Sequence, residues 1–121
     1  MKGQGFLRRF GYARAGIVTA IRRERSMRTH GAAVIAVIVF MGATGAPALW
    51  WALVGLAVGL VLVAEMANTA IETLADHLHP GQHPEIGVVK DVAAGAVLVA
   101  SVVAVIVGLA YLATLLPAMR A

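Results

Sequence analysis

The sequence predicts an all-α integral membrane protein, with three transmembrane helices preceded by an amphipathic helix on the membrane surface. Hydrophobic residues make up 60% of the 121 residues and charged residues only 13%, against about 45–50% and about 25% in soluble domains. A chain this short has too little interior to hide so much apolar surface from water, and its mean hydropathy is +0.86. Three apolar stretches follow a basic segment, and we expect one membrane-embedded domain over residues 1–121.

The segment before the first apolar stretch is basic and amphipathic. Phe6 and Phe10 begin an apolar row at helical spacing, so a surface helix is predicted over about residues 6–28. A basic flank on one side of a span is typical of the cytoplasmic side, which predicts a cytoplasmic amino terminus. No nucleic-acid recognition module accompanies the net charge of +4, so nucleic acid is not an expected partner. Most of the basic residues lie in this segment: Lys2, Arg8, Arg9, Arg14, Arg22, Arg23, Arg25 and Arg28.

Three membrane spans follow, and each needs about 20 residues to cross the hydrocarbon core. The apolar run that ends at Gly45 is short, so the first span must borrow a turn from residues near Thr29 or Pro47. The sequence from Gly45 to Pro47 is typical of a tight turn, which predicts an antiparallel hairpin between the first two spans. Trp50 and Trp51 then fit an aromatic belt at the far interface. The predicted spans are residues 29–46, 48–75 and 92–116.

The segment between the second and third spans is predicted to be a cytoplasmic loop over residues 77–90, because it contains two prolines and two glycines. Its histidines, His77, His79 and His83, suggest a zinc site, but they lack the H-E-x-x-H helix of many zinc enzymes, so a solvated loop is favoured.

Three carboxylates, Glu65, Glu72 and Asp76, lie at positions i, i+7 and i+11 of the second span and its extension. At 3.6 residues per turn they share one narrow face of the helix, with Asn68 beside them. A charge at the bilayer centre costs about 2.5–3.5 kcal/mol, and such residues usually have a function. The alternatives are a polar stripe that holds helices together by hydrogen bonds, or a Glu65 that is protonated and neutral.

Further charges are expected at the same cytoplasmic interface. Lys90 and Asp91 precede the third span, and Glu24 lies among arginines at the end of the predicted surface helix. Carboxylates together with basic residues suit a hydrated divalent cation bound to a polyphosphate. The alternative for Glu24 is a surface salt bridge to Arg28, which contributes little. The chain contains neither a P-loop nor a dinucleotide-binding glycine motif.

The segment Glu65-Met66-Ala67-Asn68-Thr69-Ala70-Ile71-Glu72, followed by Lys90-Asp91, resembles the signature of the prokaryotic diacylglycerol kinase family, which includes the undecaprenol kinases. Gly11-Tyr12 and the segment from Glu24 to His30 extend the resemblance over nearly the whole chain. The resemblance implies a homotrimer in the bacterial cytoplasmic (inner) membrane, with active sites shared between neighbouring subunits. Such a protein transfers the γ-phosphoryl group of MgATP to a membrane lipid alcohol. The E-R-x-x-R-x-H form is more similar to undecaprenol kinases than to diacylglycerol kinases.

The resemblance also implies a role for each candidate residue. Glu65 is similar to the general base of the family, and Asn68 to an active-site polar residue. Glu24 and Glu72 resemble the carboxylates that bind Mg²⁺ and the nucleotide. The remaining nucleotide contacts implied by the resemblance are Tyr12, His83, Lys90 and Asp91. Two other hypotheses stay open from the residues alone: a non-enzymatic membrane assembly protein, and a proton- or cation-conducting element with Glu65 as a relay.

Overall fold

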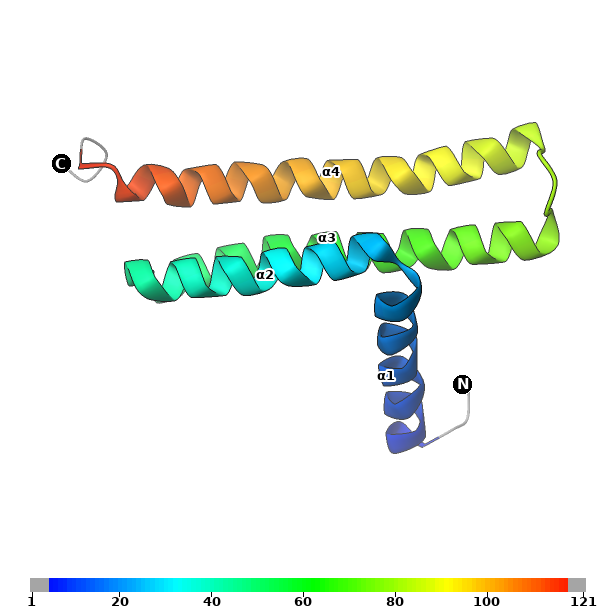
Figure 1. The fold of residues 1–121 in the computed structure, drawn as a ribbon, viewed down its shortest axis with the longest axis horizontal. Coiled ribbons are helices and arrows are strands. Elements are labelled where there is room, and N and C mark those ends of the chain that lie inside the picture. Colours follow the sequence, from blue (N-terminus) through cyan, green and yellow to red (C-terminus); the bar gives the residue numbers. More distant parts are fainter. Residues whose placement is uncertain (1–4, 118–121) are drawn as a thin grey trace.

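The computed structural model describes residues 5–117 and contains four helices in that range. The long helices run side by side, and the first helix leaves them at a steep angle (Figure 1). Three of the helices are long and apolar enough to cross a membrane, which confirms the predicted all-α architecture with three spans. Lys2 and Arg120 lie outside the described residues. The helices are α1 (Phe6–Arg23), α2 (Arg25–Thr44), α3 (Ala48–Leu78) and α4 (Pro84–Leu115).

The junction between α1 and α2 lies at Glu24, which has an extended backbone (φ −106°, ψ 117°). The prediction that the first helix continues to residue 28 was therefore wrong. Arg28 explains the break: its guanidinium donates to the carbonyls of Ile21 (3.1 Å) and Arg22 (2.8 Å) and so satisfies carbonyls in the last turn of α1. Met27 is buried beside it. The first span thus gains its missing turn from residues 25–30, on the amino-terminal side.

The turn between α2 and α3 is tight, as the sequence predicts. Gly45 ends α2 in the left-handed conformation (φ 69°), which glycine adopts without a steric penalty. The amide of Ala46 then donates to the carbonyl of Met41 (3.0 Å), which satisfies a carbonyl at the end of the helix. Pro47 directly precedes α3. The α2–α3 hairpin is therefore confirmed, with α2 ending at Thr44 and not at residue 46.

The link between α3 and α4 is shorter than predicted. Both helices continue into the predicted loop, α3 to Leu78 and α4 from Pro84, so the loop is residues 79–83 and not 77–90. Pro84 suits the first position of a helix, and the Nδ1 atom of His83 caps α4 by accepting from the amide of Glu85 (3.1 Å). The helices contain 31 and 32 residues, or about 47 Å at 1.5 Å per residue. A hydrocarbon core of about 30 Å leaves part of each helix outside it.

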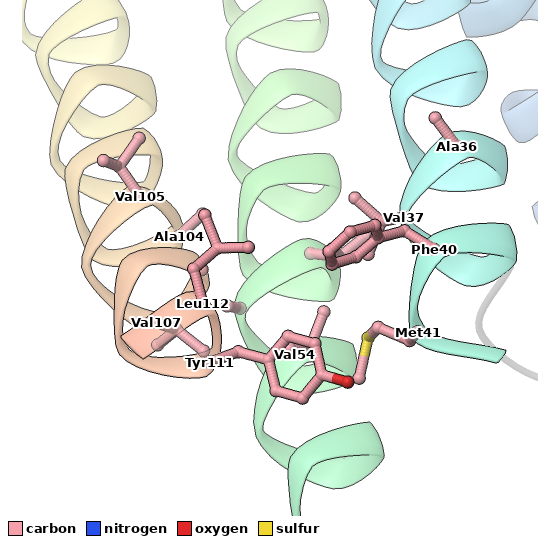
Figure 2. Close-up of a pocket in the computed structure, with 13 residues that line it drawn as sticks. Ala36, Val37, Phe40, Met41, Val54, Ala104, Val105, Val107, Tyr111 and Leu112 are labelled. Carbon is pink, nitrogen blue, oxygen red and sulfur yellow. The ribbon is translucent and has the colours of Figure 1, made fainter. Parts of the chain in front are cut away.

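The opposite end of the bundle is held by Tyr111, which is only 3% exposed. Its hydroxyl lies 2.5 Å from Thr44 Oγ1 and so joins α4 to α2. The rings of Phe40 and Trp50 pack on it, with centroids 6.3 Å and 5.6 Å away. An apolar cavity of about 520 Å³ lies between the three long helices, and Figure 2 shows the Tyr111 ring at its edge with Phe40 and Met41 opposite. Trp50 thus contributes to packing between helices.

Candidate active site

Glu65 is the only charged side chain that is buried among residues 5–117, with 7% of its surface exposed. It lies in α3, which is apolar enough to span a membrane. The environment is costly for a carboxylate, because water is replaced by apolar side chains and lipid.

Both carboxylate oxygens of Glu65 face polar groups of α2. Ser26 Oγ donates to Oε2 (3.2 Å), and His30 Nδ1 lies 3.6 Å from Oε1. Ser26 and His30 are four residues apart, which places them one turn apart on the same face of α2. The sequence assigned neither residue to the site. The sequence signal that could have indicated them is the four-residue spacing of two polar side chains just before the apolar run of the first span.

Asn68 and Glu72 form the next pair along α3. Asn68 Nδ2 donates to Glu72 Oε1 (3.3 Å), which fixes the amide one turn beyond Glu65. The other amide atom, Oδ1 of Asn68, is buried and accepts no hydrogen bond from the part of the chain that the structure describes. An unpaired buried acceptor is uncommon, and Oδ1 is free to accept from a water or a bound molecule.

Asp76 and Lys90 connect the projecting ends of α3 and α4. Lys90 Nζ lies 2.5 Å from Asp76 Oδ1, and both side chains are partly exposed, at 38% and 62%. Lys90 also lines a surface pocket of about 600 Å³ at the 79–83 loop, together with His83. The structure therefore brings two of the predicted nucleotide contacts into one pocket. Asp91 follows on the exposed surface of α4.

The two remaining candidates lie toward the amino terminus. Glu24 is half-buried at the junction of α1 and α2. The alternative of a Glu24–Arg28 salt bridge is wrong, because Arg28 donates to backbone carbonyls, and the ion pairs within residues 5–117 involve other residues. Tyr12 lies on α1 with 48% of its surface exposed.

The metal ligands available within residues 5–117 do not form a cluster of three or more. Within the described range, 5–117, no three His, Cys, Asp or Glu side chains gather to hold an ion. The rings of His79 and His83 lie 5.3 Å apart, and His83 Nδ1 is already used in capping α4. Glu24 and Glu72 provide hard oxygen ligands. They fit Mg²⁺, which commonly binds one or two carboxylates and otherwise keeps water and substrate phosphates.

Comparison with known proteins identifies the family of this chain. The family model described as prokaryotic diacylglycerol kinase matches residues 11–112. The chain is 36% identical over 104 residues to an undecaprenol kinase of Bacillus subtilis (strain 168), covering 86% of this chain and 85% of that protein. It is 41% identical over 101 residues to a diacylglycerol kinase of Synechocystis sp. (strain PCC 6803), covering 82% and 57%. It is 34% identical over 96 residues to a diacylglycerol kinase of Escherichia coli (strain K12), covering 79% of each. The chain belongs to the prokaryotic diacylglycerol kinase family.

Proposed function

We propose that this protein is an integral-membrane lipid kinase that transfers the γ-phosphoryl group of MgATP to a membrane lipid alcohol. The alcohol is diacylglycerol or undecaprenol, and the product is phosphatidic acid or undecaprenyl phosphate. Family membership supports the kinase activity, and relatives named for each substrate support both alcohols. We favour undecaprenol, because the segment from Glu24 to His30 is more similar to that of the undecaprenol kinases.

The observation that carries the proposal is the buried carboxylate of Glu65. A general base must come within about 2.6–3.2 Å of the hydroxyl whose proton it takes. A lipid alcohol is confined to the membrane, so its base must also lie within or just below the interface. Burial of Glu65, which is 7% exposed in a helix long and apolar enough to cross a membrane, supports this position. The bond from Ser26 holds Oε2, which leaves Oε1 to accept the proton.

Asn68 is the second residue that we place beside the lipid hydroxyl. Its amide nitrogen is occupied by Glu72, whereas its buried Oδ1 has no partner within residues 5–117. That oxygen is therefore available to accept from a substrate hydroxyl or from a bound water. Asn68 lies three residues after Glu65, on the same face of α3.

The nucleotide belongs above the membrane, where the charged ends of the helices lie. Glu65 and Asp76 are 11 residues apart on α3, or about 16 Å at 1.5 Å per residue. We place the ATP phosphates near Lys90, Asp91 and His83, with Tyr12 contributing from α1. Glu24 and Glu72 would hold Mg²⁺, which neutralises charge on the β- and γ-phosphates when bound.

The reaction follows from this arrangement. The proton of the lipid hydroxyl passes to Glu65 as the hydroxyl oxygen attacks the γ-phosphorus. The bond between the γ-phosphorus and its bridging oxygen breaks, and ADP leaves. Phosphoryl transfer depends mainly on positioning and charge stabilisation. A base below the interface and basic groups above it suit a reaction between a lipid and a water-soluble nucleotide.

We further propose a homotrimer in the bacterial cytoplasmic membrane, with the amino terminus in the cytoplasm. One subunit leaves many large apolar side chains of α2, α3 and α4 exposed, for lipid or neighbouring subunits to cover. Its isolated carboxylates are consistent with sites completed by a neighbour. Helix α1 extends away from the bundle (Figure 1), so it would lie along the membrane surface when the bundle spans the membrane.

Purified protein in mixed micelles tests the proposal. With MgATP and either undecaprenol or diacylglycerol, we expect phosphorylated lipid and ADP in equal amounts. If a folded oligomer forms no phosphorylated lipid with either alcohol, the kinase activity is rejected. An assembly or conducting role for the acidic stripe (Glu65, Glu72 and Asp76 on one face of α3) is then favoured.

A further inference from the structure

His30 has a buried ring nitrogen that the proposed reaction leaves unused. Nδ1 makes no hydrogen bond within residues 5–117, and it lies 3.6 Å from Glu65 Oε1. The two side chains differ in exposure, at 32% for His30 and 10% for Glu65. A larger part of the imidazole than of the carboxylate is therefore exposed at the surface of this chain.

No second titratable group lines the small cavity beside His30. The cavity measures about 150 Å³, and its other lining residues are apolar and come from all three long helices. Within the described chain, Glu65 is the ionisable group in contact with the ring. The lining residues are Ala33, Val34 and Val37 from α2, Val58, Val61 and Leu62 from α3, and Ala104 from α4.

Each turnover leaves a proton on Glu65. A lipid alcohol loses this proton when its oxygen becomes part of the phosphate ester, and the base must release it before it can act again. Direct release to water is impeded, because Glu65 is only 7% exposed. An imidazole can accept a proton at one ring nitrogen and release one from the other.

We propose that His30 is the residue through which Glu65 returns its proton to solvent. Neutral His30, with its proton on Nε2, accepts the proton of the Glu65 carboxylic acid at Nδ1 and releases the Nε2 proton to water, which restores the carboxylate. A flip of the neutral ring or proton exchange with water then returns an unprotonated nitrogen to Glu65 before the next turnover. A small ring rotation or one bridging water closes the 3.6 Å gap between Nδ1 and Oε1. The inference depends on the proposed function, since it uses Glu65 as the base. His30 acts through Glu65 and is not among the residues that we place at the nucleotide.

The test compares His30→Asn with His30→Ala, with turnover measured per folded oligomer. Asparagine keeps an N–H group near the position of Nδ1 but does not accept a proton at neutral pH. We expect turnover in both variants to fall about tenfold or more, within the range of acid–base effects, with an unchanged KM for ATP. Added imidazole should restore part of the turnover of His30→Ala. His77→Ala removes an exposed histidine of the same helix as Glu65, and should neither lose turnover nor respond to imidazole.

The outcomes separate two failures. Wild-type protein without lipid phosphorylation would reject the proposed function itself. Active wild-type protein together with near-normal turnover in His30→Asn would overturn only the relay. Asparagine can replace a histidine that merely orients Glu65, but it cannot replace one that carries a proton. Loss of turnover in His30→Ala without any response to imidazole would also overturn it.

Discussion

Ser26 Oγ donates a hydrogen bond of 3.2 Å to Glu65 Oε2 and joins two residues 39 positions apart in the sequence. The bond links the first turn of α2 to the middle of α3, close to the break at Glu24. It therefore ties the junction with α1 to the buried carboxylate. An acidic side chain that belongs to a catalytic site needs such support, because its rotamer decides where the second oxygen points.

Ser26→Ala should reduce turnover about 3–10-fold and destabilise the fold by about 0.5–1.5 kcal/mol, the usual net value of a hydrogen bond. The carboxylate loses its donor at Oε2 and samples other rotamers. Ser26→Thr keeps the hydroxyl and serves as the control, with turnover near that of the wild type. Equal losses of turnover in the alanine and threonine variants would show that the hydroxyl of Ser26 is not required for turnover. Initial rates with saturating lipid and MgATP, together with chemical unfolding, measure both effects.

Glu24→Gln and Glu72→Gln should each raise the Mg²⁺ concentration needed for half-maximal activity and raise the KM for ATP. Each substitution removes one negative ligand from a cation that binds few protein groups. Glutamine at position 72 retains the oxygen that accepts from Asn68, so the fold should be preserved. Glu85→Gln is the matched control, since Glu85 is exposed in the first turn of α4. Unchanged Mg²⁺ dependence in both test variants would place the metal on other residues.

Single cysteines should report the topology, because the natural chain contains none. Gln82→Cys in the 79–83 loop should react with a membrane-impermeant maleimide only from the cytoplasmic side. Ala48→Cys, at the start of α3 beyond the hairpin turn, should react only from the opposite side. The expected orientation follows from the basic flank of the first span. Reaction of Gln82→Cys from outside would show that the topology is the opposite of the one proposed. The charged helix ends would then lie on the side of the membrane without cellular ATP.

Tyr111→Phe should lower the stability of the bundle by about 0.6 kcal/mol, the average for hydrogen bonds between membrane helices. It removes the hydroxyl next to Thr44 but retains the ring that packs on Phe40 and Trp50. Turnover per folded oligomer should not change, because this cluster lies at the far end of the bundle. Thr44→Val and the double variant complete a thermodynamic cycle. Additive losses of stability would mean that the two hydroxyls do not interact.

The spans and the acidic stripe could be predicted because both depend on pattern within one helix. Apolar length locates the spans, and 3.6-residue periodicity places Glu65 and Glu72 on one face. The turn at Gly45 was also predictable, since few other residues adopt its left-handed backbone at low cost.

The break at Glu24 and the partners of Glu65 were not predictable in the same way. The residues around Glu24 favour a helix, and no proline or glycine marks the break, which depends on the contacts of Arg28 with the end of α1. The pairing of Ser26 and His30 with Glu65 depends on how α2 is rotated against α3, and the pattern within either helix carries no information on that rotation. The start of α4 at Pro84 had a local signal, but the charges at Lys90 and Asp91 favoured a later start.

The central claim, that Glu65 is the general base, is tested most directly by the turnover of Glu65→Gln per folded oligomer. Glutamine retains the shape and can still accept from Ser26, but it cannot take a proton from a lipid hydroxyl. We predict that turnover with undecaprenol and with diacylglycerol falls about 10²–10⁴-fold, while the KM for ATP and oligomer assembly are nearly unchanged. A Glu65→Gln protein with wild-type turnover would contradict the account, as would a variant whose only defect is failure to assemble.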